Sequence, residues 1–356
     1  MDFFLLRRYN ARMEHCQKTR LALAPLLCVA VLAASAKSPA RRAVTFTDDL
    51  GRTVEVRGAE SAAVLQGSLA SLWILAGGTV RAATSDCFSE PPALTREQAE
   101  RLNGAWRTDG FFAHEKGIFS YVGAHQERAM DAGTMMSPNA ERIIASGADF
   151  AILSANIAGH KKILPLLENV GIACAFFSYD DFASFVRIMR ILTDITGRSD
   201  LYERNVLAQI GEVERLAAAA RAKTPPAVLA LRASGANVKA KSSESLAAAA
   251  MLKHLNCANI ADTDGAYKEN LSMEKIIADD PDFIFVTTMG ASEEKALRFM
   301  EETLLTNPAW NELKAVKSGN YFILPRELFH FKPGTRWSES YRVLFSVLYG
   351  DHAAMR

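Results

Sequence analysis

The sequence lacks the patterns that would assign it to several common classes. It has no Gly-x-Gly-x-x-Gly or Walker loop, so nothing supports nucleotide binding. Its 41 lysines and arginines barely exceed its 40 aspartates and glutamates, so the basic footprint of a nucleic-acid-binding protein is absent. Its five cysteines are irregularly spaced and form no disulfide framework. The histidines beyond residue 36 show no close pairing and no His-rich loop, which argues against a Zn²⁺ or Mn²⁺ site.

The N-terminus resembles a secretory signal peptide. Residues 1–36 contain five basic and two acidic side chains, an apolar run at 21–34, and the small-x-small sequence Ala34-Ser35-Ala36. The apolar run is shorter than the roughly 20 residues that span a bilayer, so a membrane anchor is the weaker interpretation. Cys28 raises a lipid anchor as an alternative, but the residues before it lack the small side chains that lipoprotein processing requires. We expect a protein that is exported to the periplasm or another extracytoplasmic compartment.

Two short stretches of the chain repeat one another. The stretch that begins at Asn139 aligns without a gap with the stretch that begins at Ser272, and the match includes Ile-Ile-Ala and Asp-Phe. Both first residues suit an N-cap, so Glu141 and Glu274 fall in the first turn of a helix. A continuously apolar strand follows each helix, which is typical of a parallel sheet covered on both faces. The duplication predicts two similar α/β lobes.

The remaining pattern predicts an N-terminal lobe at 43–178, a helical linker at 179–224 and a C-terminal lobe at 225–356. A β-hairpin is expected around an Asp-Asp-Leu-Gly turn at the start of the first lobe. A helix at 199–222 would span about 36 Å, which suits a connector between lobes. Further strands are expected at 62–66, 80–84, 150–153, 172–177, 228–232, 283–286 and 321–324, and further helices at 69–76, 181–196, 245–255, 293–303 and 338–349.

Five short motifs follow one another along the chain: Phe46-Thr47-Asp48-Asp49-Leu50-Gly51-Arg52, Ser68-Leu69-Ala70-Ser71-Leu72-Trp73, Pro138-Asn139-Ala140-Glu141-Arg142-Ile143, Leu271-Ser272-Met273-Glu274-Lys275-Ile276-Ile277, and Asn307-Pro308-Ala309-Trp310 with Leu313-Lys314-Ala315-Val316. In this order they resemble the substrate-binding proteins of ABC importers for ferric siderophores, haem and vitamin B12. The resemblance covers residues 43 to 350. Each motif is weak by itself, and their common order carries the resemblance.

The resemblance implies an α/β fold of two Rossmann-like lobes with central parallel sheets, joined by a single long helix. It also implies that each lobe carries one surface glutamate that pairs with an arginine of the membrane permease. Glu141 and Glu274 match those two positions. A simpler interpretation is that each glutamate only offsets a helix dipole. The duplication together with the resemblance favours docking to an ABC permease.

In the resembling family the ligand lies between the lobes, near loops that follow strands, as ligands of open α/β sheets generally do. Our strand assignment also places Gly67 and Met289 there. The stretch from Phe329 to Trp337 mixes aromatic rings with cations, which can pack on an organic chelator and answer its acidic groups. The alternative is that Trp337 is core and Arg336 is solvated. The expected ligand-binding residues are Ser68, Trp73, Tyr179, Arg232, His330, Lys332, Arg336 and Trp337.

We therefore predict a monomeric solute receptor without a cofactor or catalysis, which binds a metal chelate, in the first place a ferric siderophore. Haem or a corrinoid stays open, with His330 as a possible axial ligand. A secreted sensor that uses the same fold also stays open. Ser68 follows a strand and precedes a helix, as a hydrolase nucleophile does, but Gln66 stands where the nucleophile motif requires glycine.

Overall fold

The computed structural model describes residues 43–89, 129–263, 273–290, 293–330 and 332–350. The expected signal peptide and the expected N-cap at Ser272 lie outside these ranges. From Arg41 onwards the chain forms one compact unit. No helix in the described part is long and apolar enough to cross a membrane.

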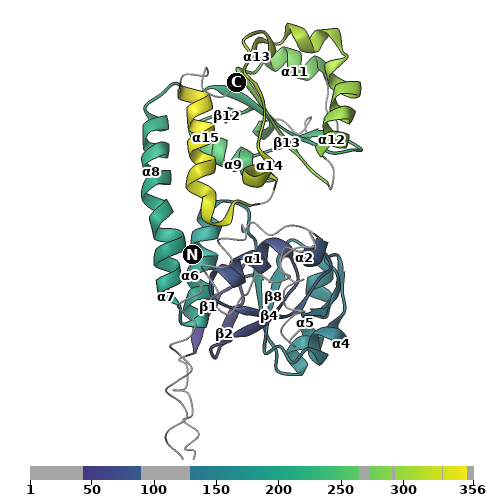
Figure 1. Ribbon diagram of the computed structural model, residues 1–356, viewed down its shortest axis with the longest axis vertical. Coiled ribbons are helices and arrows are strands. Elements are labelled where there is room, and N and C mark those ends of the chain that lie inside the picture. Colours follow the sequence, from purple (N-terminus) through teal and green to yellow (C-terminus); the bar gives the residue numbers. More distant parts are fainter. Residues whose placement is uncertain (1–42, 90–128, 264–272, 291–292, 331, 351–356) are drawn as a thin grey trace, which may run out of the picture. The chain divides into compact units, whose positions relative to one another are not determined.

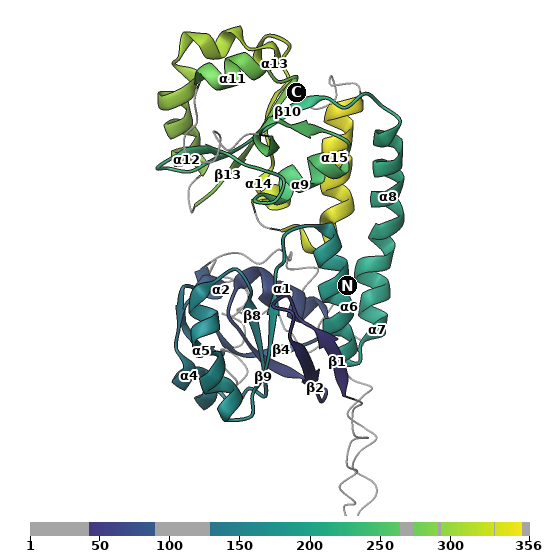
Figure 2. The same ribbon diagram turned by 180° about the vertical axis from the view of Figure 1, so that it is seen from behind.

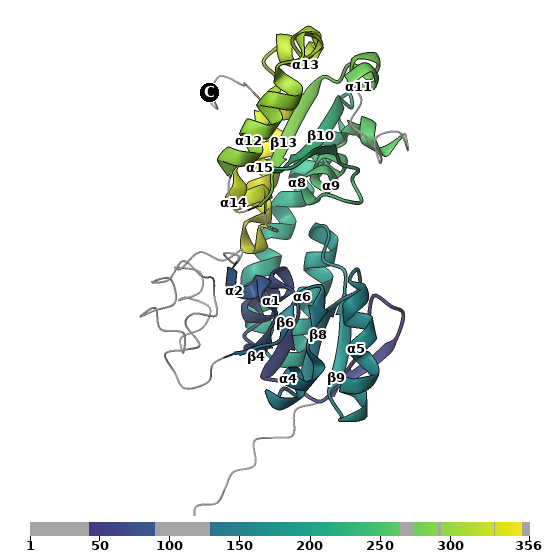
Figure 3. The same cartoon turned by 90° about the vertical axis from the view of Figure 1, so that its right-hand side faces the viewer.

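The first lobe is built on a five-stranded parallel sheet with the order β5-β4-β3-β8-β9. Along β3, successive side chains point to opposite faces of the sheet. Ala62 and Val64 belong to the hydrophobic cluster on one face, and Ala63 and Leu65 belong to the cluster on the other face. Figure 3 shows helices on both faces of this sheet. The elements are β3 (Ser61–Val64), β4 (Thr79–Ala83), β5 (Met130–Asp131), β8 (Phe150–Ser154), β9 (Ala173–Phe177), α1 (Gly67–Leu75), α2 (Asp86–Ser89), α4 (Ala140–Ala145) and α5 (Ala158–Asn169), with the small hairpin β6 (Gly133–Thr134) and β7 (Ser137–Pro138).

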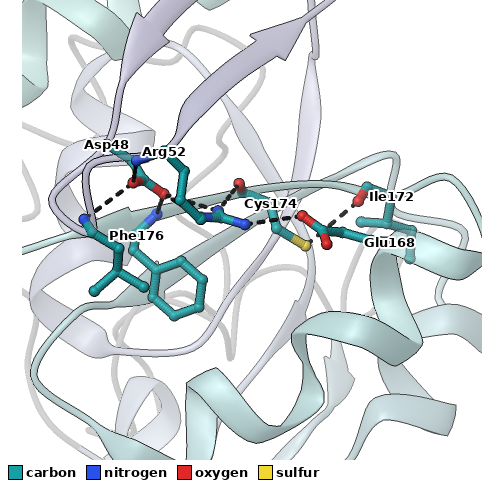
Figure 4. Close-up of polar contacts among 7 residues, drawn as sticks. Asp48, Arg52, Glu168, Ile172, Cys174 and Phe176 are labelled. Carbon is teal, nitrogen blue, oxygen red and sulfur yellow. Dashed lines mark hydrogen bonds and ion pairs between the residues drawn. The ribbon is translucent and has the colours of Figure 1, made fainter.

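The expected N-terminal hairpin is confirmed, and its turn is fastened to the sheet. β1 (Val44–Thr47) and β2 (Thr53–Val56) pair in antiparallel fashion. Figure 4 shows the buried Asp48 carboxylate accepting hydrogen bonds from the Arg52 guanidinium and from the backbone N–H of Phe176 on the edge strand β9. Arg52 also donates to the backbone oxygen of Cys174 at 2.7 Å and pairs with Glu168 of α5. The Asp-Asp-Leu-Gly-Arg motif is therefore structural.

A helical block follows the first lobe (Figure 1). It consists of α6 (Phe182–Thr196), α7 (Ser199–Tyr202), the π-helical segment η3 (Glu203–Leu207) and α8 (Ala208–Arg221). Asp181 caps α6 by accepting from the Ser184 N–H, and Gly197 ends it in the left-handed conformation. The expected helix 199–222 forms but contains a π-segment, where the Asn205 amide donates to the backbone oxygen of Leu75 at the end of α1.

The second lobe contains a sheet with the order β11-β10-β13-β14, in which β12 also pairs with β10 (Figure 2). All pairs are parallel except β10 with β11. The antiparallel β11 is a correction, because the sequence predicts only a loop there. The elements are β10 (Ala227–Ala233), β11 (Val238–Ala240), β12 (Ala258–Asn259), β13 (Phe283–Thr288), β14 (Tyr321–Ile323), α9 (Ala247–His254), η4 (Ile260–Asp262), α11 (Met273–Asp279), α12 (Glu293–Met300), η5 (Glu301–Leu305), η6 (Pro308–Glu312), α13 (Lys314–Lys317), α14 (Arg326–Phe329), η7 (Gly334–Arg336) and α15 (Trp337–Tyr349).

The internal repeat is visible in the structure. Helix α4 begins at Ala140 and α11 at Met273, and the strands that follow begin at Phe150 and Phe283, so both pairs keep the spacing found in the sequence. Every residue of β8 and β13 is buried. The continuously apolar strands are therefore covered on both faces, as the sequence predicts.

Candidate functional site

The first strand of the N-terminal sheet, β3, ends where the strand order reverses, and α1 begins directly after it. This is the position at which open α/β sheets bind ligands. The Gly67 N–H at the start of α1 donates to the Asp86 carboxylate at 2.7 Å, and Thr84 donates to the same carboxylate at 2.5 Å. The Asp86 carboxylate therefore already accepts a hydrogen bond from the N-terminus of α1. The Ser68 hydroxyl is buried and has no hydrogen-bond partner in the described part of the chain.

Trp73 lies inside the first lobe. Its side chain is fully buried, and its indole Nε1 donates to the backbone oxygen of Thr79 at 2.6 Å. Gly78 approaches the ring so closely that a Cβ there would lie 2.0 Å from the indole. In this structure the indole presents no surface to a ligand, and Trp73 is not among the ligand contacts proposed below.

Tyr179 and Trp337 contact each other. The indole Nε1 of Trp337 donates to the Tyr179 hydroxyl at 3.1 Å, and the two rings lie 6.2 Å apart. Phe182 and Phe185 of α6 pack against the same indole. Burial raises the pKa of Tyr179, so its hydroxyl stays neutral. Trp337 is fully buried and forms core at the start of α15, as the alternative in the sequence analysis has it.

Lys332 reaches the same aromatic group from the segment between α14 and η7. Its ammonium lies 5.4 Å from the centre of the Tyr179 ring, within the range of a cation–π contact. Burial is the largest cause of the lowered pKa of Lys332. The charges of Asp180 and Asp181 oppose this lowering, and the charge of Arg232 adds to it. Lys332 therefore lies near two expected ligand residues, Tyr179 of the linker and Arg232 of the second lobe.

Arg232 lies near the C-terminal end of β10 and is half-buried. Burial lowers the pKa of its guanidinium. Within the described ranges, no hydrogen bond or ion pair reaches its side chain. Lys241, just after β11, is also half-buried, and burial together with the charges of Arg232 and Lys239 lowers its pKa. Lys241 is not predicted from the sequence, because its place beside β10 depends on the short antiparallel strand β11, which was not expected.

His330 is held by two neighbours at the end of α14. Its Nδ1 lies 2.5 Å from the backbone oxygen of Thr288, which can only accept, so Nδ1 carries the proton. Its Nε2 lies 3.5 Å from the Arg326 guanidinium. Burial, with the charges of Arg326 and Arg232, lowers the pKa of His330. In the part of the chain that the structure describes, no group of three His, Cys, Asp or Glu side chains could hold a metal ion.

Arg336 and Met289 occupy different surroundings. Arg336 donates from Nε and Nη2 to the two carboxylate oxygens of Glu339, at 2.6 and 2.7 Å, in the first turn of α15. This pairing makes it a positioned helix-end arginine and not a solvated cation. Met289 follows β13, and its side chain is 43% exposed, so a ligand can reach it.

The two repeat glutamates are both exposed. Glu141 lies in the first turn of α4, where the Asn139 side chain accepts from the Arg142 N–H as the N-cap. Glu274 lies in the first turn of α11. Neither carboxylate forms an ion pair with another residue of the described ranges. Both side chains are therefore accessible to a partner.

A cavity of about 520 Å³ lies away from the strand ends, among α6, α8, α9 and α15. Its lining includes Phe182, Ile210, Glu214, His254 and Tyr341. The His254 Nδ1 lies 2.9 Å from the Tyr341 hydroxyl, and Glu214 lies 3.9 Å from the other ring nitrogen. The sequence gives no signal for this cavity, because its walls come from four separate helices.

Comparison with solved structures shows which proteins share this fold. The chain shares its fold with BauB, a siderophore-binding protein bound to ferric iron and acinetobactin (16% identity, 87% of this chain and 100% of that chain, TM-score 0.63). It also matches S. aureus IsdE complexed with heme (14% identity, 82% and 100%, TM-score 0.59) and the iron-uptake binding protein FeuA of Bacillus subtilis (19% identity, 87% and 100%, TM-score 0.58). These likenesses establish the two-lobe fold.

The family itself follows from the sequence model of the periplasmic binding proteins, which matches residues 63–328. This chain belongs to that family. Its members bind solutes and are not enzymes, so Ser68 is no catalytic nucleophile. Comparison with curated protein sequences finds no match.

Proposed function

We propose that the protein is an extracytoplasmic receptor that captures a metal chelate, in the first place a ferric siderophore, and delivers it to an ABC permease. The observation that carries this proposal is the family match, which extends from the first sheet to the second. The fold shared with proteins whose structures hold a ferric siderophore or heme supports a chelate as the ligand. Haem is the second candidate for the same reason, and a corrinoid would bind by the same mechanism.

The proposed ligand site uses the strand ends of both lobes. Ser68 contributes a buried hydroxyl without a described partner, and Lys332 and Arg232 contribute positive charge. His330 and Arg336 lie in the segment that joins α14 to α15 and would act at the margin of the site. The ring of the buried Tyr179 forms a cation–π contact with the Lys332 ammonium.

Delivery is proposed to use Glu141 and Glu274. Their equivalent places at the starts of α4 and α11 support a symmetric pair of contacts, and exposed carboxylates at an interface steer encounter and fix register. An exposed carboxylate in the first turn of a helix contributes little to folding, about 0.3–1 kcal/mol, so both residues can be exchanged without unfolding the protein. We also propose that the mature protein is a monomer from which residues 1–36 have been removed as a signal peptide.

A binding panel tests the ligand class. The purified protein is titrated with ferric catecholate, carboxylate and hydroxamate siderophores, haemin and cobalamin, while intrinsic fluorescence is followed. Trp337 should report binding, because it is bonded to Tyr179 beneath Lys332. A dissociation constant near micromolar corresponds to about 8 kcal/mol. If no iron or cobalt chelate binds, the proposal is wrong.

A further inference from the structure

Three basic side chains of the second lobe, two lysines and one histidine, lie on segments that meet the C-terminal end of β10, where Arg232 lies. Lys241 follows β11, His330 ends α14, and Lys332 precedes η7, yet the charge of Arg232 lowers the pKa of all three. Two segments supply these groups: the Lys241 N–H donates to the Ala230 oxygen of β10 at 2.8 Å, and His330, two residues before Lys332, contacts Thr288, which pairs with Ala233 of β10. Arg326 adds a further cation beside His330.

No described carboxylate forms an ion pair with the cations of this group. Neither Arg232, Lys241 nor Lys332 forms an ion pair with any residue in the described ranges, although all three are at least half-buried. The charges of Asp180 and Asp181 raise the pKa of Lys332 without a described ion pair, and Asp181 is already committed to the N-cap of α6. Glu293 accepts from the Thr288 hydroxyl at 3.1 Å. Burying a charge without a partner costs free energy, so an uncompensated cluster disfavours the empty state.

The other cations of this region show the contrast. Arg336 is paired with Glu339 through two hydrogen bonds, and Arg326 donates to the backbone oxygen of Gly290 at 2.7 Å. These side chains are satisfied by the protein. Arg232 and Lys332 are not, and they lie at a strand end and on the segment facing it, where a ligand of this family is expected.

We infer that the ligand is an anion, and that Arg232 and Lys332 together bind its acidic group. This inference rests on the proposed function and narrows the class of ligand. Ferric catecholates, ferric carboxylates and haem, with its propionates, are expected ligands, whereas neutral or cationic hydroxamate chelates and the corrinoids are not. Lys241 lies beside Arg232 and strengthens the positive potential at the site. The Tyr179 ring holds the Lys332 ammonium in place, and it carries no charge of its own to compete with the ligand.

The test compares two ferric chelates of similar size, a tris-catecholate complex and a trihydroxamate complex without free acid groups. The parent protein should bind the anionic complex at least about tenfold more tightly, the effect of one charge-assisted hydrogen bond. Arg232→Gln and Lys332→Met should each remove about that factor for the anionic complex, while Lys332→Arg retains it. Lys253→Met, an exposed lysine of α9 without a described ion pair, is the matched control and should change nothing.

A second readout requires no ligand. Since Arg232→Gln removes a half-buried charge that has no described ion pair, the melting temperature of this variant without ligand should stay equal to that of the parent or rise. Metal-free citrate should raise the melting temperature of the parent more than that of either variant. If one variant fails to fold, the other decides the outcome.

The results separate this inference from the function on which it rests. Equal or tighter binding of the neutral chelate, or unchanged anion binding in both variants, would overturn the anionic assignment while leaving chelate capture in place. Absence of binding by every chelate, together with a citrate effect that depends on Arg232 and Lys332, would overturn chelate capture and retain the anion site. Absence of both would overturn both.

Discussion

The indole of Trp337 donates a hydrogen bond to the hydroxyl of Tyr179, 158 residues earlier in the chain. The bond joins the first turn of α15 to the segment that leaves the first sheet. The same buried core continues from Val64 and Phe150 of the first sheet to Val228 and Phe285 of the second. A change at Tyr179 should therefore affect folding, and it should also affect the Lys332 side chain above its ring.

Tyr179→Phe should lower the free energy of unfolding by about 1–3 kcal/mol, because the buried indole N–H of Trp337 loses its acceptor. Chemical denaturation with urea measures this loss. Tyr321→Phe is the matched control, since among the described residues the Tyr321 hydroxyl donates only to the Met300 sulfur at 3.7 Å, and sulfur is a weak acceptor. A loss no greater than that of the control would contradict a structural role for the Trp337 bond.

Gly78→Ala should destabilise the first lobe by about 1–3 kcal/mol, the cost of overpacking a filled core. The new methyl group would lie 2.0 Å from the buried Trp73 ring, which cannot move without leaving Thr79. Gly211→Ala in α8 is the control. Nothing lies within 4 Å of its Cβ position, so this change should be neutral or should stabilise the helix. Thermal unfolding of both variants, followed by circular dichroism, checks the opposite signs.

Acidification should destabilise the protein through His160. The buried imidazole accepts from the Ser154 N–H and donates to the backbone oxygen of Met135, and burial lowers its pKa below the ordinary 6.5. As pH falls below 6.5, the unfolded chain takes up a proton that the folded chain resists, so the free energy of unfolding decreases. His160→Gln should flatten this dependence between neutral and acidic pH. His330, whose pKa is also lowered, contributes equally to parent and variant.

An unchanged pH dependence in His160→Gln would show that other groups dominate acid destabilisation. The glutamine can accept from Ser154 and donate to Met135, so the variant should remain folded at neutral pH.

Charge reversal at both repeat glutamates should abolish productive docking. Glu141→Lys combined with Glu274→Lys is expected to leave folding and chelate affinity unchanged, because both side chains are exposed. Stimulation of ATP hydrolysis by the reconstituted permease should disappear. Glu203→Lys combined with Glu244→Lys reverses two other exposed glutamates and should stimulate as the parent does. Normal stimulation by the first pair would return Glu141 and Glu274 to a role at their helix ends.

The sequence predicts the architecture well where its periodicity is strong. The repeat correctly locates α4, β8, α11 and β13, because short helices followed by buried strands produce a recognisable order of polar and apolar residues in the sequence. Helix α5 is not predicted, since it contains Pro165 and exposes Leu166. Strand β11 has only three residues, too few for a visible alternation.

The candidate site is predicted less completely, because a sequence gives residue types and not the faces they occupy. Trp73 and Trp337 are large aromatics near expected ligand loops, yet both are fully buried. Arg336, which was expected to contact the ligand, forms an ion pair with Glu339, three residues later in the chain. Lys241 joins Arg232 only through the pairing of β10 with β11, which sequence periodicity does not reveal.

Capture and delivery of a chelate are tested most directly by uptake of radioactive iron. Cells that lack the chromosomal copy of this protein are supplied with the chelate that binds the purified receptor. The parent protein should restore uptake, and the variant with Glu141→Lys and Glu274→Lys should not, although it binds the same chelate in solution. Equal uptake with and without the protein would contradict its role as the receptor of an importer.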